Sequence, residues 1–259
     1  MERPTIILTG ASQGIGAAAA RIAARRGAQL VLAARNREAL ERAAVEVATL
    51  GGTAVIVAGD VSDWAVCQEI VHRAVATFGR IDALINNAGI IGPLTLVAEL
   101  PVDEWKQTFE VDLFGAVWLC REAVPHLRLT DGRIVNVSSG AAVNPVTGGS
   151  AYCSAKAALL QFSKVLALEE QNLTILSYYP GEVDTHMQAE IRSKTRVGPF
   201  EDIHRYFVEQ YEQGRLMSPE QSALAVVALA LGAQKEWSGE FLSDDEARIQ
   251  DLTRHFFNG

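Results

Sequence analysis

The feature that most constrains this chain is a series of short apolar segments that alternate with longer segments of helical spacing. The apolar segments are rich in Ile, Val and Leu and read TIILTG, QLVLAA, TAVIVAGD, IDALINNAG, GRIVNVSS and LTILSYYP. Strands without polar alternation are buried on both faces, as in a parallel sheet covered by helices. Right-handed crossovers between such strands give an α/β fold. We therefore predict a single doubly wound parallel sheet with helices on both faces, the Rossmann fold.

Helices are expected between these strands. Their predicted ranges are residues 14–26, 36–50, 62–78, 101–129, 150–171 and 218–232. Gly27 can end the first helix, and Ser62 and Ser218 can begin later ones. No repeat or linker divides the chain, so we predict one domain over residues 1–259. Residues 184–217 interrupt the alternation with charged and aromatic side chains, and we expect this excursion to cover the edge of the sheet as a lid.

A glycine-rich turn joins the first strand to the first helix. TGASQGIG, at residues 9–16, is followed directly by AAAARIAARRG. At such a junction the backbone N–H groups and the helix dipole face an anion such as a pyrophosphate. Gly10 would form the tight turn, Gly14 would admit a cofactor, and Gly16 would let the helix pack on the strand. The spacing G-x-x-x-G-x-G is neither of the common nucleotide motifs, so the strand-to-helix context favours a dinucleotide more than the glycines alone do.

The end of the second strand favours NADP(H). An acidic residue there would accept hydrogen bonds from the ribose hydroxyls of NAD and repel a 2′-phosphate. QLVLAARN instead has Ala34 at that end, followed by Arg35. A guanidinium group can hold the 2′-phosphate of NADP through two hydrogen bonds. The alternative is that Arg35 is a solvated residue at the start of the next helix.

Composition argues against several other classes of function. A net charge of −8 and a pI near 5.2, without a stripe of Lys and Arg, argue against nucleic-acid binding. No segment reaches the roughly eighteen apolar residues of a membrane span, and MERPTIILTG lacks the pattern of a secretory leader. We therefore expect no membrane partner and a cytoplasmic location. Cys67, Cys120 and Cys153 have neither disulfide nor zinc spacing, so we predict no metal and expect three buried, reduced thiols.

SAYCSAK, residues 150–156, places a tyrosine and a lysine four positions apart on a predicted helix. Tyr152 and Lys156 therefore share one face. Taken alone, this spacing is more often a surface pair than a reactive one. Four further motifs change the interpretation: TGASQGIG, NNAG at 86–89, the serine pair at 138 and 139, and PGEVDT at 180–185.

In this order, over nearly the whole chain, the five motifs resemble those of the short-chain dehydrogenases/reductases. The segments VSSGAAVNP, AYCSAKAAL, VDTHMQ and LMSPEQ are similar to the fungal branch described as sepiapterin reductase-like or benzil reductase-like. The resemblance implies that Tyr152 is the catalytic acid or base and that Lys156 supports it and binds the nicotinamide ribose. It also implies that Ser139, which lies 13 residues before Tyr152, holds the substrate carbonyl in preference to Ser138.

The resemblance further implies that Asp60 and Val61 lie near the adenine, that Asn86 and Gly89 follow the cofactor cleft, and that residues 180–185 surround the nicotinamide carboxamide. From the glycine turn and the resemblance together, the residues expected to hold the cofactor are Gly10, Ser12, Gln13, Gly14, Ile15, Gly16, Arg35, Asp60, Val61, Asn86, Ala88, Gly89, Tyr152, Lys156, Pro180, Gly181, Val183 and Thr185.

Reduction of a ketone needs a proton donor at the oxygen, where negative charge develops. A cation about 4 Å from a phenol contributes about 4 kcal/mol at an effective dielectric constant near 20, or about three pKa units before burial opposes it. We therefore expect Lys156 to lower the pKa of Tyr152 toward neutrality. The phenol could then donate a proton to an alkoxide, or accept one in the reverse direction.

One position departs from the family pattern. The family usually has Asn in a segment like V-N-L-x-G, where this chain reads VDLFG with Asp112. An ionised aspartate accepts hydrogen bonds only and adds a negative charge near Lys156. Asp112 is therefore included among the expected catalytic residues, with two outcomes: an altered proton relay that still works, or a protein that binds the cofactor with little turnover.

We predict an NADP(H)-dependent carbonyl reductase whose substrate, a compact ketone or diketone, lies between residues 140–149 and the 184–217 excursion. The helices at 101–129 and 150–171 are expected to pair copies of the chain into a homodimer or homotetramer. The alternatives are an NAD-preferring alcohol dehydrogenase or 3-oxoacyl reductase, and an NADPH-binding sensor. The physiological substrate and its stereochemistry do not follow from the sequence.

Overall fold

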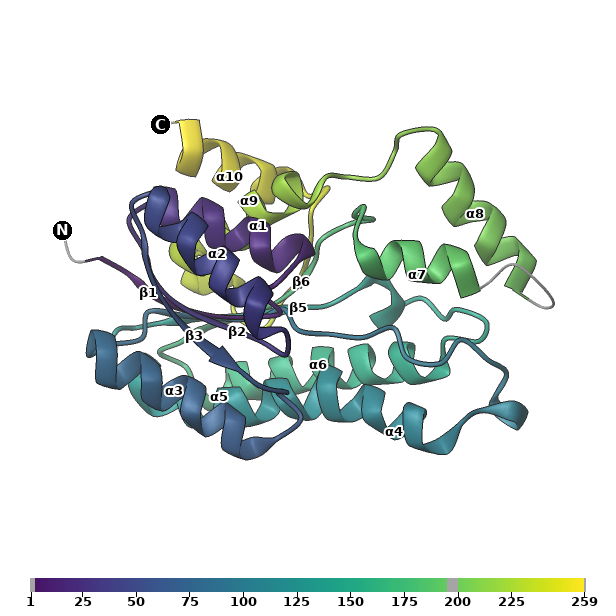
Figure 1. Cartoon of the computed structure of the whole chain (residues 1–259), viewed down its shortest axis with the longest axis horizontal. Coiled ribbons are helices and arrows are strands. Elements are labelled where there is room, and N and C mark those ends of the chain that lie inside the picture. The colour runs from purple at the N-terminus through teal and green to yellow at the C-terminus, as the bar shows by residue number, and fades with distance from the viewer. Residues whose placement is uncertain (1–2, 195–199, 259) are drawn as a thin grey trace.

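The computed structural model describes residues 3–194 and 200–258. Within these residues the strands form one parallel sheet in the order β3-β2-β1-β4-β5-β6-β7 (Figure 1). The strands are β1 (Thr5–Thr9), β2 (Gln29–Ala34), β3 (Thr53–Ala58), β4 (Ala83–Asn86), β5 (Arg133–Val137), β6 (Thr174–Tyr179) and β7 (Phe241–Ser243). The predicted doubly wound fold is confirmed. The sequence analysis missed β7 because three residues carry too little pattern to mark a strand.

Helices cover both faces of the sheet. In Figure 1, α1, α2, α9 and α10 lie on one side, and α3, α5 and α6 lie on the other. The helices are α1 (Gly14–Arg25), α2 (Arg37–Thr49), α3 (Trp64–Phe78), α4 (Val102–Phe109), α5 (Gly115–Leu127), α6 (Ser150–Glu169), α7 (His186–Lys194), α8 (Glu201–Glu212), α9 (Pro219–Gly232) and α10 (Ala247–Asn258). None in the described ranges is long and apolar enough to cross a membrane.

The helix predicted over residues 101–129 is a composite. Here α4 and α5 are joined by a π-helical turn at Glu110–Phe114. A π-turn adds a residue to the helical repeat and rotates the side chains that follow, and such turns are frequent at functional sites. Asp112 lies in the middle of this turn.

Of the two serines predicted to begin helices, one is an N-cap in the structure and the other is not. Ser218 caps α9 through a reciprocal pair of hydrogen bonds with Gln221, at 3.2 and 2.9 Å. The prediction for Ser62 was wrong, because the side chain of Asp63 caps α3 by accepting from the Ala65 N–H at 2.8 Å. The N–H and the hydroxyl of Ser62 instead donate to the carboxylate of Asp60.

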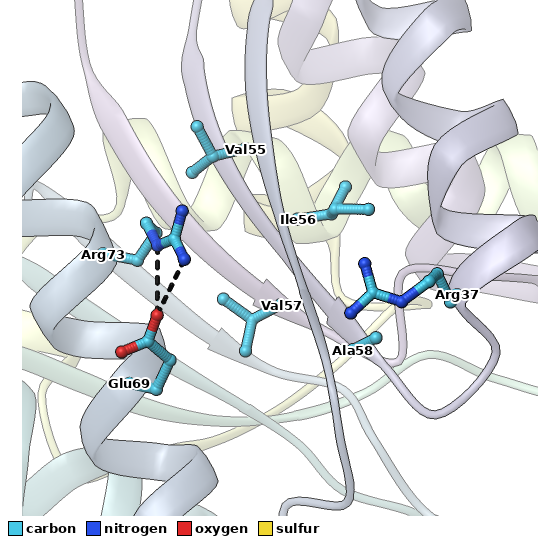
Figure 2. A pocket seen from close by; sticks show the side chains of 7 residues that line it. All are labelled: Arg37, Val55, Ile56, Val57, Ala58, Glu69 and Arg73. Atoms are coloured by element: carbon cyan, nitrogen blue, oxygen red, sulfur yellow. Dashed lines mark hydrogen bonds and ion pairs between the residues drawn. The ribbon is translucent and has the colours of Figure 1, made fainter.

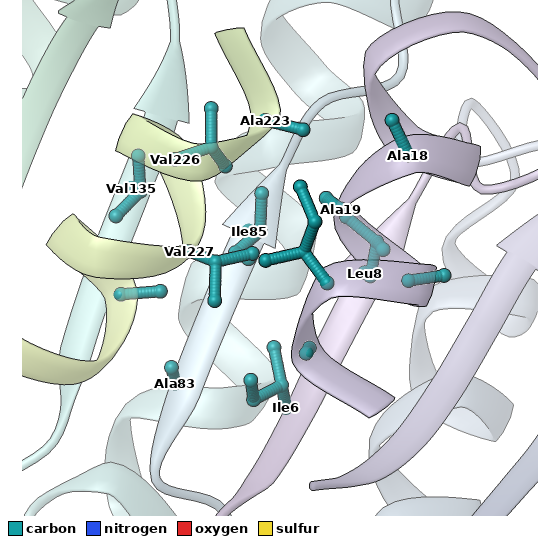
Figure 3. Packing of buried hydrophobic residues seen from close by; sticks show 14 of the residues in the cluster. Ile6, Leu8, Ala18, Ala19, Ala83, Ile85, Val135, Ala223, Val226 and Val227 are labelled. Atoms are coloured by element: carbon teal, nitrogen blue, oxygen red, sulfur yellow. The ribbon is translucent and has the colours of Figure 1, made fainter. Parts of the chain in front are cut away.

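Alternate residues of the strands point to opposite faces and build two hydrophobic layers. On the α1 and α9 side, Ile6, Leu8 and Ile85 pack against small helix residues such as Ala19 and Ala223 (Figure 3). These alanines have no side chain beyond Cβ, so the two helices approach the sheet and each other closely. The opposite layer joins the remaining strand residues to α3, α5 and α6.

The excursion after β6 forms α7 and α8, which lie beside the sheet and its covering helices in Figure 1. Its base is closed by a parallel bridge between Val183 and Met217, with Asp184 N–H donating to the Met217 carbonyl at 2.9 Å. The segment therefore leaves and rejoins the body at one point. Part of the predicted lid, residues 195–199, lies outside the described residues.

Candidate active site

A cavity of about 940 Å³ is lined by residues from the turns that follow β1 to β6 and from the first two turns of α6, α7 and α8. In a parallel sheet these turns lie at one edge, and ligands bind where the strand order reverses, here between β1 and β4. The predicted site residues that line the cavity are Gly10, Ser12, Gln13, Gly14, Ile15, Arg35, Asp60, Val61, Ala88, Gly89, Ser139, Tyr152, Lys156, Pro180, Gly181, Val183 and Thr185. Gly16, Asn86 and Asp112 are not in that lining.

The glycine turn has the geometry of a cradle. Gly10 and Gly14 have positive φ values of 64° and 55°, which favour residues without a Cβ. A Cβ on Gly16 would lie 2.2 Å from the Gly10 carbonyl oxygen, so this glycine allows α1 to pack against the turn although it does not face the cavity. A Cβ on Gly14 would lie 3.3 Å from Thr185 across the cavity mouth. These residues fit the pyrophosphate of a dinucleotide, with α1 beginning at the turn.

The end of the cavity beside β2 and β3 contains Arg35 and Asp60. Arg35 Nη1 lies 4.0 Å from Asp60 Oδ2, and the arginine side chain is 65% exposed. The other oxygen of Asp60 accepts from the N–H and the hydroxyl of Ser62, at 3.0 and 2.9 Å, which orients the carboxylate. The guanidinium group therefore lies at the cavity mouth, where a phosphate could reach it.

Three side chains from two parts of the chain converge in the cavity. Tyr152 and Lys156 come from the first two turns of α6, and Lys156 Nζ lies 5.5 Å from the centre of the tyrosine ring. Ser139, at the end of β5, is within hydrogen-bonding reach of the Tyr152 phenol. Its oxygen also accepts from the Ala141 N–H at 3.1 Å, which holds the hydroxyl in place.

Asp112 forms a buried ion pair with the lysine. Its Oδ2 lies 3.2 Å from Lys156 Nζ, and the exposed fractions of the two side chains are 0% and 5%. The other carboxylate oxygen accepts from the Ile90 N–H at 2.8 Å, and Lys156 also donates to the Val137 carbonyl at 3.2 Å. Burial opposes the charge on Lys156, but Asp112 and Tyr152 outweigh burial and raise the lysine pKa. The pair therefore keeps an ammonium group beneath the phenol.

The expected lowering of the Tyr152 pKa was wrong. Burial raises this pKa, Lys156 lowers it, Asp112 raises it and Ser139 lowers it, with burial the largest effect and a net shift upward. The main physical reason is that burial disfavours the charged phenolate more than the ammonium group favours it, and the carboxylate of Asp112 offsets part of that ammonium charge. The phenol is therefore protonated near neutral pH and available as a proton donor.

Asn86 lies behind the cavity and not along it. Its amide donates to Asn136 Oδ1 at 2.8 Å, and the Asn136 amide donates to Ser163 Oγ at 2.8 Å. This buried chain of hydrogen bonds ties β4 and β5 to α6. Asn87, which the sequence analysis passed over, lines the cavity, and its amide donates to the Thr9 carbonyl at 2.9 Å. Because Asn87 is the second residue of the NNAG motif, the motif could have predicted this position.

The remaining wall comes from the 140–149 segment, from residues 179–183 at the end of β6 and beyond it, and from the excursion. Tyr179, the last residue of β6, and Glu182 lie on this wall. Tyr179 was not predicted, and Glu182 was included only as part of the 180–185 segment. Cys153 also lines the cavity and is half-buried, so the expectation of three buried thiols fails there, whereas Cys67 and Cys120 are buried.

A separate, shallower hollow lies along the outer edge of β3 (Figure 2). Arg73 in this hollow forms an ion pair with Glu69 one turn away on α3, at 2.9 Å, and Arg37 faces it from the start of α2. This hollow shares no residue with the cavity.

The fold and the glycine cradle define a protein with a doubly wound sheet that can hold a dinucleotide. Residues 4–196 match the short chain dehydrogenase family. The chain belongs to the short-chain dehydrogenases/reductases.

Two relatives and one solved structure show how far the likeness extends. An uncharacterized oxidoreductase of Schizosaccharomyces pombe is 35% identical over 240 residues, which cover 92% of this chain and 94% of that protein. Meso-2,3-butanediol dehydrogenase of Serratia marcescens is 33% identical and covers 88% of both chains. A short chain dehydrogenase/reductase structure from Saccharomyces cerevisiae has a TM-score of 0.87 at 30% identity and covers 96% of this chain and 99% of its own.

Solved relatives include complexes with both dinucleotides. An NAD⁺-bound xylitol dehydrogenase has a TM-score of 0.84 at 26% identity and covers 93% of this chain and 97% of its own. An alcohol dehydrogenase from Thermococcus sibiricus, complexed with 5-hydroxy-NADP, has a TM-score of 0.79 at 27% identity, with coverage of 93% and 96%. The likeness therefore leaves the choice between NAD and NADP open.

Proposed function

We propose that this protein is an NADP(H)-dependent carbonyl reductase that converts a ketone or diketone to an alcohol. The observation that carries the proposal is the convergence of the Ser139 hydroxyl and the Lys156 ammonium on the Tyr152 phenol, inside the cavity onto which the glycine turn opens. A phenol between a second donor and a cation is suited to protonate an oxygen that gains negative charge.

In the proposed reaction Tyr152 donates its proton to the carbonyl oxygen, and Ser139 donates a hydrogen bond to the same oxygen. The nicotinamide supplies the hydride when bound. Lys156 stabilises the phenolate that remains, and Asp112 keeps the buried lysine charged at 3.2 Å. In the reverse direction the phenolate accepts the proton of the alcohol. The raised pKa of Tyr152 favours the reductive direction at neutral pH.

The cofactor would extend from the adenine end to the active tyrosine. Asp60 and Val61 would lie beside the adenine, the 9–16 turn would hold the pyrophosphate, and Lys156 would bind the nicotinamide ribose. The segment at 180–185, which also lines the cavity, would contact the carboxamide. The cavity volume of about 940 Å³ has room for a dinucleotide and a small carbonyl compound.

Arg35 supports NADP(H) over NAD(H). Its guanidinium group lies at the cavity mouth, and β2 ends in Ala34, so no carboxylate at that strand end competes for the ribose. The nearest acid, Asp60, is already bonded to Ser62. A 2′-phosphate would therefore contact the exposed guanidinium group of Arg35, next to an Asp60 carboxylate that already accepts hydrogen bonds from Ser62.

A compact ketone or diketone is the proposed substrate class. The part of the cavity covered by α7 and α8 is lined by apolar and aromatic groups, among them Val146, Met187 and Phe207. A relative named for a vicinal diol is consistent with this class. We propose one catalytic domain over residues 1–259, with the 184–217 excursion as its substrate cover. The likeness to the fungal sepiapterin or benzil reductase-like branch and the cytoplasmic location stay predictions.

We also propose a homodimer or homotetramer. The outer face of α6 exposes 42% of Val165 and 76% of Leu168, and Trp64 of α3, 44% exposed, lies against Trp118 of α5 with 6.2 Å between ring centres. Exposed apolar groups on neighbouring helices favour burial by a second copy. Light scattering of the wild type and of Leu168→Glu tests this: we expect an oligomer that the charge weakens, and a wild-type monomer at micromolar concentration would contradict the proposal.

The decisive test of function is a panel of ketones and diketones assayed with NADPH and NADH side by side. We expect oxidation of NADPH by at least one compact ketone, with a higher kcat/KM than for NADH. A preference for NADH would favour the alcohol dehydrogenase or 3-oxoacyl reductase alternative. Tight NADPH binding without turnover, unchanged by Tyr152→Phe, would favour a sensor.

A further inference from the structure

Three carboxylates line the part of the cavity that α7 and α8 cover, and they differ in their partners. Glu190 forms an ion pair with a lysine one turn along α7, and Asp202 forms one with an arginine one turn along α8. Glu182, in the segment after β6, has no Lys or Arg within ion-pairing distance among the described residues. Among the described residues its charge is therefore not paired with a cation, and Arg215 acts electrostatically on the bonded Tyr206 without forming an ion pair with Glu182.

The carboxylate of Glu182 is held by a neutral group. The Tyr206 hydroxyl on α8 donates to Glu182 Oε1 at 2.5 Å. This bond uses one lone pair of one oxygen, and an ionised carboxylate has about four acceptor positions. Glu182 can therefore accept further hydrogen bonds from a molecule in the cavity while it stays bonded to α8.

Aromatic side chains line the same part of the cavity as this carboxylate. Tyr206 and Phe207 meet edge to face with ring centres 5.2 Å apart, and both line the cavity together with Tyr179. Burial, followed by the charge of Glu182, raises the pKa of Tyr179, so that phenol is neutral. A carboxylate beside aromatic faces is a suitable environment for an ammonium group, because both the charge and the ring quadrupoles attract a cation.

The described lysine and arginine side chains that line the cavity form no ion pair with Glu182. Among the described residues, the Lys and Arg side chains that line the cavity are Arg35, at the adenine end, and Lys156, which is paired with Asp112. A substrate carboxylate near Glu182 would face repulsion without a cation to bind it.

We propose that Glu182 is a specificity-determining residue that selects carbonyl substrates carrying an ammonium group, or another N–H donor, and rejects substrates carrying a carboxylate. This inference rests on the proposed function, since it concerns the substrate of the same site. The inference limits the proposed substrates to ketones that are neutral or positively charged, and it disfavours ketones that carry a carboxylate.

The test uses three ketones of similar size: para-acetylbenzylamine, para-methylacetophenone and para-acetylbenzoate. They carry an ammonium, a neutral methyl and a carboxylate group on the same ring. For the NADPH-loaded wild type we expect kcat/KM to fall in that order. In Glu182→Gln, which keeps an acceptor for Tyr206, we expect the preference for the amine over the neutral ketone to fall about tenfold, and the penalty on the carboxylate to shrink by a similar factor.

The matched control is Glu201→Gln, which removes the same charge from an exposed position on α8 that does not line the cavity. We expect its ratios to follow the wild type. Equal ratios in Glu182→Gln and the wild type, or a wild-type preference for the carboxylate, would overturn the assignment.

Failure of the proposed function gives a different result, namely no turnover of any of the three ketones. Calorimetric binding of the same compounds to the NADP⁺ complex would then decide the charge preference by itself. Equal affinities would overturn the role of Glu182, whereas tighter binding of the amine that Glu182→Gln abolishes would support it.

Discussion

The two halves of the cavity are built in different ways. The half beside β1 to β4 is made from turns at the ends of buried strands, and Thr9 Oγ1 accepts from the N–H groups of Asn87 and Ala88, both at 3.0 Å. The half under α7 and α8 is made from helices with little buried surface. Gln188 is the one buried residue of α7, and α8 has none in the described structure.

In the proposed function, the first half of the cavity holds the cofactor and the reacting groups, and the second half selects the substrate. Backbone groups at strand ends cannot move without disturbing the sheet, so the cofactor half keeps its geometry. The substrate half is held by side-chain contacts such as Tyr206 to Glu182, and Arg192 lies over the Tyr211 ring at 4.0 Å. Regions with few buried apolar contacts open at a lower free energy than the core. We therefore expect mutations on the strand-end side to abolish activity and mutations on the helical side to change selectivity.

The largest effect is expected for Tyr152→Phe. Removing the phenolic oxygen removes the proton donor, so kcat for ketone reduction should fall about a thousandfold. NADPH affinity, measured by fluorescence titration, should change little because the ring and Lys156 remain. Tyr211→Phe, which alters a hydroxyl outside the cavity lining, is the matched control. Loss of activity in both variants would show a folding defect and contradict the assigned role.

Arg35→Ala tests the cofactor half. Loss of a charged hydrogen-bonding group should raise the KM for NADPH about thirtyfold and leave the KM for NADH nearly unchanged. Arg37→Ala is the control, because Arg37 lies two residues further along and faces the hollow at β3 (Figure 2). If Arg35→Ala weakens both cofactors equally, the proposed contact with the 2′-phosphate is wrong.

Asp112→Asn should move the pH dependence. Asp112 raises the pKa of Tyr152, so its neutral replacement should lower that pKa as long as Lys156 stays protonated. Alcohol oxidation needs the phenolate and rises as the pH increases through the pKa. Ketone reduction needs the phenol and declines over the same range. Both midpoints should therefore shift to lower pH in kcat/KM profiles.

Asp103→Asn on α4, an exposed carboxylate, controls for net charge in that experiment. A purely structural role for Asp112 predicts reduced activity at every pH with unchanged midpoints, and that outcome would contradict the electrostatic role.

The smallest effect is expected for Tyr206→Phe. It removes one neutral donor from Glu182, which should raise the KM for a ketone about threefold. The affinity for NADPH should stay as in the wild type, since α8 lies on the other half of the cavity. A large loss of NADPH binding would mean that the two halves of the cavity are coupled and would contradict their separate roles.

Much of the cofactor half could be predicted because its signals are local. Strand periodicity, Gly10 and Gly14 all act within a few residues, and the ordered motifs located Ser139 and Tyr152. Asn86 was misplaced because adjacent strand residues face opposite ways, and a motif does not say which of two asparagines faces the cleft. The pKa of Tyr152 was misjudged because it depends on burial and on the position of Asp112, which are properties of the assembled site.

The sequence by itself determined the sheet, the glycine cradle, and which tyrosine, lysine and serine were candidates for chemistry. The sheet and the cradle follow from backbone sterics and hydrophobic periodicity, which act over short distances along the chain. The tyrosine, lysine and serine follow from the ordered motifs and from the family resemblance that those motifs carry. Only the tertiary structure decided that a π-turn brings Asp112 to within 3.2 Å of Lys156, and that Glu182 meets α8 beside the cavity without a cationic partner among the described residues. Electrostatic interactions act through space, so they exist only once segments far apart in the sequence have been packed together.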